Sequence, residues 1–223
     1  LLGNIVGPED IGQAYTTVSS IYDSEFIETM HRYNISMLNS LDAPKHAKIL
    51  DLACGTGFNS QWLADKYPDS VIDGVDISAG MLEEAGRKLK GKVHLHQAAM
   101  RGYLGQCGNG TYDVIVCSWA LKYQPPKKVL RECKRVLKKG GQIGVILNTR
   151  YTLPEVRRIY KRLLIDNSHK VNKLMLELPN PEDEKELFTW FDKTGFSAIS
   201  TQKGSRSFTF PSSPEMADWV TST

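Results

Sequence analysis

The stretch from Lys48 to Phe58 constrains the fold of this chain more than any other. It places a short apolar run, Ile49 to Leu52, directly before two glycines that are separated by one residue. The apolar run predicts a buried strand, and the residues from Phe58 onward predict a helix. Gly55 and Gly57 allow a tight turn between this strand and this helix. They also let a ligand approach the backbone beside the helix N-terminus. The stretch therefore predicts a strand–turn–helix corner that binds a nucleotide-like ligand.

Two acidic residues narrow the kind of ligand. Asp51 lies inside the predicted strand, where a buried carboxylate is costly unless it meets a partner such as a cation. Asp76 ends a second apolar run about 20 residues after the glycine turn, where an acid can accept hydrogen bonds from ribose hydroxyls. Together the two acids favour a ligand with a ribose and a positive group over a plain dinucleotide.

Both segments resemble a known family. Asp51-Leu-Ala-Cys-Gly-Thr-Gly57, followed by Gly74-Val-Asp-Ile-Ser78, is similar to the first two motifs of the class I S-adenosylmethionine-dependent methyltransferases. The resemblance implies S-adenosylmethionine as cofactor and transfer of its methyl group by in-line displacement. An NAD or FAD turn would carry a third glycine where this chain has Ser60, and its strand usually lacks an acid at Asp51. A strand-to-helix turn without any ligand is the remaining alternative.

The apolar patterning predicts one α/β domain over residues 1–223. Expected strands alternate with helices, as is typical of a parallel sheet covered on both faces. The strands are 48–53, 71–76, 92–97, 112–118 and 141–148, and the helices between them are 58–67, 79–89 and 126–138. Gly140 and Gly141 are expected to stop the last of these helices before the fifth strand. Residues 1–46 form an N-terminal part with helices over 8–41, and residues 47–150 form the cofactor-binding core. Residues 196–202 and 206–210 predict an antiparallel hairpin. The resemblance thus implies a Rossmann-like, seven-stranded, mostly parallel sheet that ends in an antiparallel hairpin.

Residues 151–180 interrupt this alternation. They contain a basic, amphipathic helical stretch over 151–173, and they are longer than a simple crossover needs. We expect an inserted helical lid here, and expect residues 181–223, with a helix over 182–194, to return to the core. The layout around Asn148–Glu155 and His169–Asn172 resembles malonyl-carrier-protein O-methyltransferases. The acceptor is accordingly expected to be a small molecule or a carrier-bound group. The basic residues of the stretch would meet an acidic acceptor or form a solvated helix face.

Composition excludes several other classes. The net charge of +3 does not favour nucleic acid, and no apolar run approaches the length of a membrane span. The basic residues within 127–139 fit a solvated helix face. The four cysteines lack metal-site spacing and favour a reducing, cytoplasmic compartment. We therefore expect no metal, no nucleic-acid partner and no membrane partner, while the sequence does not indicate an oligomeric state.

The resemblance also assigns cofactor contacts. It places the methionine part of the cofactor along the backbone of Ala53, Cys54, Gly55, Thr56 and Gly57. Asp51 would balance its positive charge, Asp76 would bind the ribose hydroxyls, and Ile77 and Met81 would lie against adenine. The other implied contacts come from two tyrosines that close over the methionine end and from the ends of the third and fourth strands: Tyr15, Tyr22, Ala99, Met100 and Cys117.

One position departs from the family pattern. Many relatives carry an acid where this chain has Ala99, so adenine must be recognised by backbone, water or another side chain. No catalytic residue is assigned, because the five histidines are scattered and in-line positioning needs little further machinery. Two alternatives stay open. One is a non-methylating, S-adenosylmethionine-binding or regulatory protein of the same fold, and the other is an enzyme that transfers a different group from the sulfonium.

Overall fold

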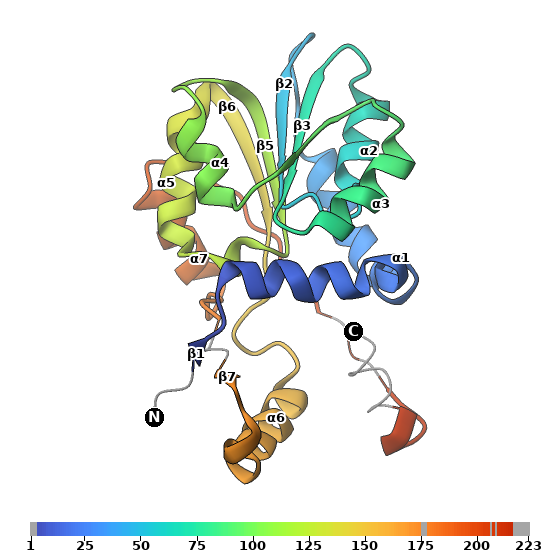
Figure 1. Cartoon of the computed structure of the whole chain (residues 1–223). Helices are drawn as coiled ribbons and strands as arrows, with labels where there is room; N and C mark the ends of the chain where they lie inside the picture. The colour runs from blue at the N-terminus through green and yellow to red at the C-terminus, as the bar shows by residue number, and fades with distance from the viewer. Residues whose placement is uncertain (1–3, 175–177, 206, 208, 216–223) are drawn as a thin grey trace.

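The computed structural model describes residues 4–174, 178–205, 207 and 209–215, with only the backbone of 24–29. Five strands form one parallel sheet in the order β4-β3-β2-β5-β6 (Figure 1). Their bounds are β2 Lys48–Leu52, β3 Val71–Asp76, β4 His94–Gln97, β5 Tyr112–Ser118 and β6 Leu137–Ile146. The chain winds outward from β2 in one direction and from β5 in the other. The carboxyl ends of β2 and β5 therefore meet at a topological switch point, where open α/β sheets bind ligands.

Helices cover both faces of this sheet (Figure 1). They are α2 Phe58–Lys66, α3 Ala79–Leu89, α4 Met100–Gln106, α5 Pro126–Val136 and α7 Glu184–Asp192. Successive strand residues point to opposite faces. Leu50 thus joins an apolar cluster with α4, α5 and α7, whereas Ile49 joins a second cluster with α2, α3 and the end of α1. Both clusters are built mainly from buried apolar side chains, and they hold the strand ends in fixed positions.

One long helix, α1 Pro8–Asn39, spans most of the N-terminal part. Its first half crosses the carboxyl edge of the sheet (Figure 1). Asp10 begins the helix by accepting a hydrogen bond from the Gly7 N–H at 2.9 Å. Its last turns pack on β6, where Gly144 leaves room for the side chains of Met37 and Leu41. The expected helical N-terminal part is confirmed, and it forms a wall along the edge that carries the strand ends.

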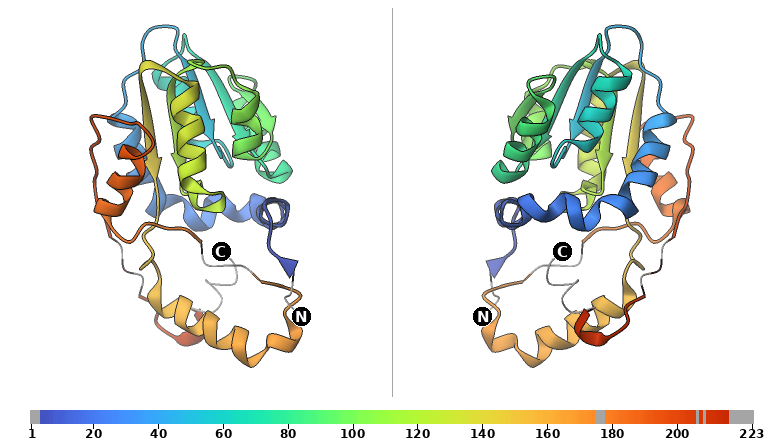
Figure 2. Two further views of the ribbon diagram at one scale, coloured as in Figure 1. Left: turned by 90° about the vertical axis from the view of Figure 1, so that its left-hand side faces the viewer. Right: turned by 90° about the vertical axis from the view of Figure 1, so that its right-hand side faces the viewer.

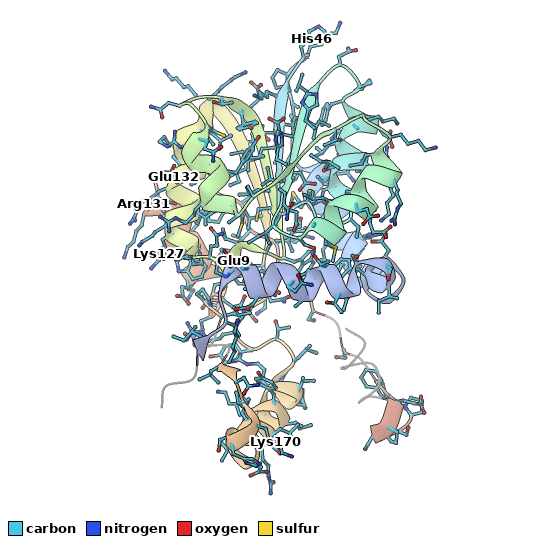
Figure 3. The ribbon with its side chains drawn as sticks, viewed as in Figure 1. Glu9, His46, Lys127, Arg131, Glu132 and Lys170 are labelled. Atoms are coloured by element: carbon cyan, nitrogen blue, oxygen red, sulfur yellow. The ribbon has the colours of Figure 1, made fainter. Side chains whose placement is uncertain are left out.

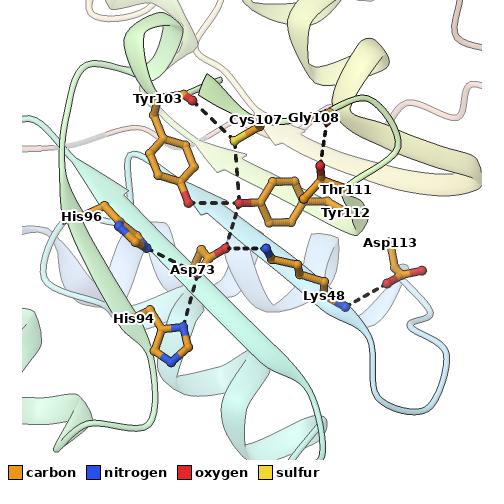
Figure 4. Close-up of polar contacts among 10 residues, drawn as sticks. All are labelled: Lys48, Asp73, His94, His96, Tyr103, Cys107, Gly108, Thr111, Tyr112 and Asp113. Carbon is orange, nitrogen blue, oxygen red and sulfur yellow. Dashed lines mark hydrogen bonds and ion pairs between the residues drawn. The ribbon is translucent and has the colours of Figure 1, made fainter. Parts of the chain in front are cut away.

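A buried carboxylate joins the strands on one side of the sheet (Figure 4). Asp73 of β3 is 5% exposed and accepts a hydrogen bond from the Tyr112 hydroxyl of β5 at 2.8 Å. Lys48 of β2 and His94 and His96 of β4 lie within ion-pair distance of the same carboxyl group. Burial raises the pKa of Asp73, but the contacts with Tyr112, His96 and Lys48 together outweigh it and hold the pKa below its usual value. The ionised carboxylate therefore bridges four neighbouring strands.

Strand β6 begins four residues earlier than its sequence suggests. Helix α5 ends at Val136 rather than 138, and β6 runs from Leu137 through Gly140 and Gly141. The pairing with β5 shifts register between Tyr112 and Val114, and a Cβ on Gly141 would approach the Asp113 carbonyl oxygen to 2.9 Å. The two glycines form a bulge inside the strand and not a helix stop before it. The short helix α4 was not expected at all.

The expected antiparallel hairpin is wrong, and so is the seven-stranded sheet. The described residues after Gly195 contain no strand, while Arg206 and Phe208 lie outside the described residues. Ala198 adopts a left-handed φ of 53°, which breaks an extended run. Phe196 and Ile199 instead pack against the apolar cluster beside α7. The alternation of apolar and polar residues over 196–202 thus belongs to an irregular segment that covers the core, and not to a strand.

Residues 151–174 lie beyond α1, on the side away from the sheet (Figures 1 and 2). They include α6 Pro154–Asp166, the short helix η2 Ser168–Lys170 and strand β7 Lys173–Leu174. β7 pairs in parallel with β1 Asn4–Ile5, near the chain's beginning. Among the described helices, none has the length and apolar character needed to cross a bilayer.

Candidate functional site

A cavity of about 700 Å³ opens at the switch point, between the strand ends and α1. Nine of the sequence-predicted contacts line it: Tyr15, Tyr22, Ala53, Gly55, Asp76, Ile77, Met81, Ala99 and Met100. A second hollow of about 490 Å³ adjoins the first, and both are lined by Tyr22, Ala53, Gly55, Ser118 and Trp119. Cys54 and Thr56 line the second hollow. An elongated ligand could therefore run past Gly55 from one space into the other.

The two glycines of the turn have different surroundings. A Cβ on Gly55, whose φ is +54°, would meet nothing within 4 Å, so open space lies above it. A Cβ on Gly57, whose φ is +89°, would meet Leu89 at 3.0 Å and Ala85 at 3.3 Å. Gly57 thus allows α3 to pack closely against the start of α2, while Gly55 faces the ligand space. A side chain at residue 57 would therefore press on α3, and one at residue 55 would enter the ligand space.

The turn is attached to α1 and α3 through Asp23. The Thr56 hydroxyl donates to the Asp23 carboxylate at 2.6 Å, and Lys88 of α3 pairs with the same carboxylate. The glycine turn, α1 and α3 are thereby joined by charge-assisted contacts, which are stronger than neutral hydrogen bonds. This arrangement holds the turn in place against both helices.

Asp76 lies at the end of β3 and faces the cavity. Its carboxylate accepts hydrogen bonds from the backbone N–H groups of Gly55 and Ser78, each at 2.9 Å. Burial is the largest influence on this group and raises its pKa, while these N–H groups act in the opposite direction. The acid is thus oriented by the backbone at the position that the sequence predicts for a ribose contact.

Asp51 is fully buried beneath the turn. Its Oδ2 accepts a hydrogen bond from the Ser60 hydroxyl at 2.7 Å, whereas its Oδ1 has no hydrogen-bond partner among the residues that the structure describes. Burial raises the pKa of Asp51 to about 6. A buried carboxylate with an unpaired oxygen fits a positively charged ligand nearby, because such a charge would favour its ionised form. The sulfonium and ammonium groups of S-adenosylmethionine meet this requirement.

Three tyrosines form one wall of the larger cavity. The hydroxyl groups of Tyr15 and Tyr123 are 2.7 Å apart and share a hydrogen bond, and Tyr15 also packs edge-on against Tyr22. Burial raises the pKa of all three, to about 12 for Tyr22. They stay protonated at neutral pH, so they shape the cavity and donate hydrogen bonds but do not act as bases.

A buried polar network borders the second hollow. The Asn34 amide donates to Asn59 at 2.8 Å, Asn59 donates to the Ser118 hydroxyl at 3.0 Å, and the Trp119 indole donates to Asn34 at 2.8 Å. Trp119 has a left-handed φ of 65°. Strained backbone and satisfied buried amides often occur together at binding sites. This network was not predicted, because its members come from three separate elements.

His31 is the histidine nearest to this chemistry. It lines the second hollow, and its ring stacks on Phe58 with centroids 3.4 Å apart. Burial lowers the pKa of His31, so its neutral form predominates at neutral pH. The other four histidines line neither hollow.

Several sequence-predicted contacts do not face the open space. Asp51, Gly57 and Cys117 line neither hollow, and Cys117 belongs to the buried apolar cluster. The sequence also missed lining residues on α1 and at or after the end of β5, where no motif marks them. Among these are Pro8, Ile11, Asp23, Met30, His31, Asn34, Ser118, Trp119, Ala120, Tyr123 and Gln124. The departure at Ala99 could have prompted a search for Gln124, which lines the same cavity.

Comparisons with known proteins agree with the motifs. A family described as "Methyltransferase domain" matches residues 49–141. The demethylmenaquinone methyltransferase of Lactococcus lactis subsp. lactis (strain IL1403) is 26% identical over 217 residues, which cover 89% of this chain and 86% of that protein. A Thermotoga maritima protein of the same name is 35% identical over 101 residues, which cover 44% of this chain and 42% of that protein.

A solved structure shares the fold. The phosphoethanolamine N-methyltransferase 2 of Haemonchus contortus, in complex with S-adenosyl-L-methionine, is 17% identical with a TM-score of 0.66. The match covers 88% of this chain and 46% of that one. At this identity the likeness concerns the fold. Together with the family match and the named relatives, it confirms the resemblance drawn from the two motifs.

Proposed function

We propose that this chain is a class I methyltransferase that uses S-adenosylmethionine to methylate a small-molecule acceptor by in-line displacement. The observation that carries the proposal is the pair of adjoining hollows that meet at Gly55. The larger hollow suits the nucleoside of the cofactor, and the smaller one leaves space beyond the turn for an acceptor.

The chain's residues would bind and orient the cofactor in distinct ways. Asp76 would accept hydrogen bonds from the ribose hydroxyls, and Ile77 and Met81 would lie against adenine. The backbone of 53–56 would follow the methionine part, while ionised Asp51 would balance its positive charge from beneath the turn. The cofactor itself supplies a methyl group activated by a positively charged sulfur. With that group bound, alignment and exclusion of water provide most of the catalytic effect that this chain needs.

Gln124 is our candidate for recognition of adenine. It lines the cavity together with Ala99, and its Oε1 accepts a hydrogen bond from the Arg101 N–H at 3.0 Å. This bond fixes the amide group beside the N-terminus of α4. A side chain with both donor and acceptor atoms can replace an acid in reading the edge of a base.

The acceptor is proposed to carry an apolar or aromatic ring. Two relatives that align with this chain over most of their own length are named demethylmenaquinone methyltransferases. The hollows are bordered by aromatic side chains, among them Tyr22, Phe58 and Trp119. A carrier-bound acceptor is a second candidate, favoured by the basic residues of α6. Residues 151–180 would act as the lid that selects between such acceptors.

The test is methyl transfer from labelled S-adenosylmethionine to a panel of acceptors. The panel contains a demethylmenaquinone analogue with a short side chain, small carboxylic acids and an acylated carrier protein, and the products are identified by mass spectrometry. We expect a methylated ring compound, and expect less product with the Asp76→Ala variant when the labelled cofactor is below saturation. Methylation of the carrier alone, or cofactor binding without methylation of any small acceptor, would contradict the proposal.

A further inference from the structure

Helix α6 is amphipathic, yet its apolar face is uncovered in the described chain. Val156, Ile159, Tyr160, Leu163 and Leu164 follow the i, i+3, i+4, i+7, i+8 spacing that lines one side of a helix. No residue of α6 is buried against the other described residues, and Ile159, Tyr160 and Leu163 are 47%, 49% and 54% exposed. A contiguous apolar face in water marks a surface that binds something.

The other side of α6 is mostly basic, with Ile165, 75% exposed, as its one apolar residue. The acids stand at the two ends of the helix, Glu155 and Asp166, and four basic residues occupy the turns between them: Arg157, Arg158, Lys161 and Arg162. Lys170 adds a further positive charge at the far tip of the molecule (Figure 3). The apolar face therefore has positive charges along its flanks.

We propose that this surface, α6 together with the β1–β7 pair, docks on an anionic lipid membrane. A helix with an apolar face and lysines and arginines on its polar side lies in the plane of the membrane interface. Its cations meet negative headgroups while its apolar side chains enter the acyl boundary. A nucleic acid would use the charges but leave the apolar face in water. A second copy of the chain would bring like charges together, which opposes self-association.

The position of α6 supports this occupant. The neighbouring β1–β7 pair extends the apolar surface, because Ile5 and Leu174 are 60% and 39% exposed. Both elements lie on the far side of α1 from the sheet (Figures 1 and 2). Docking would thus turn the carboxyl edge of the sheet toward the lipid without insertion of a transmembrane helix. The inference goes beyond the proposed function and does not depend on the acceptor.

Vesicle sedimentation tests the docking directly. The whole chain is mixed with large vesicles of phosphatidylcholine alone or of phosphatidylcholine and phosphatidylglycerol in equal parts, at low and at physiological salt. We expect binding to the phosphatidylglycerol vesicles that weakens at higher salt, and at least tenfold weaker binding to phosphatidylcholine.

Three double variants distinguish membrane binding through α6 from a general effect of net charge. Ile159→Ser with Leu163→Ser removes the apolar contact, and Arg158→Glu with Arg162→Glu reverses the charge. Each should lower the bound fraction at least tenfold and leave the melting temperature unchanged, because these side chains are exposed. The matched control is Lys128→Glu with Arg131→Glu on α5, which changes the net charge equally on a helix whose apolar face is buried (Figure 3).

Three results would overturn the proposal. One is an absence of binding to phosphatidylglycerol vesicles, and another is an equal loss of binding in the α5 control. The third is a concentration-dependent dimer, measured by light scattering, that Ile159→Ser with Leu163→Ser abolishes, since α6 would then bind a second copy of the chain.

Discussion

The carboxylate of Asp76, at the end of β3, accepts a hydrogen bond from the backbone N–H of Gly55, in the turn after β2, at 2.9 Å. One residue therefore fixes the shape of the glycine turn and also faces the cavity where a ribose would lie. The sequence alone does not show whether Asp76 supports the turn, contacts the ligand or does both. Variants of both residues are needed to distinguish them.

Replacement of Asp76 by alanine should weaken binding of S-adenosylhomocysteine by about 1–3 kcal/mol, the usual cost when a buried polar partner is removed. Titration calorimetry measures the loss. Asp69→Ala, at an exposed aspartate outside both hollows, is the control and should bind normally. An unchanged affinity in Asp76→Ala would remove this residue from the site.

Alanine at Gly55 and alanine at Gly57 should differ in their effects on stability and on cofactor binding. Gly57→Ala should lower the free energy of unfolding by about 1–3 kcal/mol, because a left-handed residue acquires a Cβ that presses on Leu89. Gly55→Ala has the same left-handed backbone cost but adds its Cβ to open space, so it should lower stability less and also weaken cofactor binding. Thermal unfolding with and without S-adenosylhomocysteine compares the two. A ligand-induced increase in melting temperature that survives in Gly55→Ala would move the cofactor elsewhere.

Cofactor affinity should depend on pH through Asp51. Because burial raises its pKa from 3.8 to about 6, the folded chain holds this proton more tightly than the unfolded chain. Its contribution to stability therefore falls as pH rises from about 4 to about 6. A cationic ligand prefers the ionised carboxylate, so affinity for S-adenosylmethionine should rise over pH 5 to 7, where an α-amino group with pKa of about 8 stays charged.

The control for this pH dependence is Asp51→Asn. It cannot ionise, so calorimetry across the same pH range should show a weaker rise than in the natural chain. The residual slope would come from Asp76, whose pKa is also raised. Identical slopes in the two proteins would show that Asp51 does not sense the ligand's charge.

Gln124→Ala should weaken S-adenosylhomocysteine binding by about 0.5–1.5 kcal/mol, the net value of one hydrogen bond. It should affect an analogue that lacks the adenine amino group much less. Gln97→Ala is the matched control, because Gln97 is exposed at the end of β4 and lines neither hollow. Equal losses for both ligands would place Gln124 away from the adenine edge.

The sequence predicted those parts of the fold that depend on local pattern. Strands 71–76 and 112–118 and helix 79–89 have the expected bounds, because buried apolar runs and a Ser78 cap specify them locally. The glycine pair at 140–141 was misread, since a bulge and a helix stop use the same residue type. The final hairpin failed for a related reason: the alternation of 196–202 does not reveal the left-handed Ala198.

Site residues that are neighbours in the sequence could be predicted, whereas contacts between residues far apart in the sequence could not. Residues of the glycine turn and of the strand ends follow one another in sequence. The Asn34–Asn59–Ser118 network instead joins α1, α2 and β5, which only folding brings together. The Tyr15–Tyr123 bond likewise spans α1 and the segment after β5. Such partners have no spacing rule that a single sequence could display.

The β1–β7 pair has a consequence for how different parts of this protein exchange amide hydrogens. Two short strands, with Ile5 and Leu174 exposed, hold residues 151–174 against the chain's beginning. So small a contact opens at a fraction of the free energy needed to unfold the central sheet. Amides of α6 should therefore exchange long before those of β2 and β5. Residues 151–174 can therefore change shape, or diverge between related enzymes, without disturbing the cofactor cavity at the sheet.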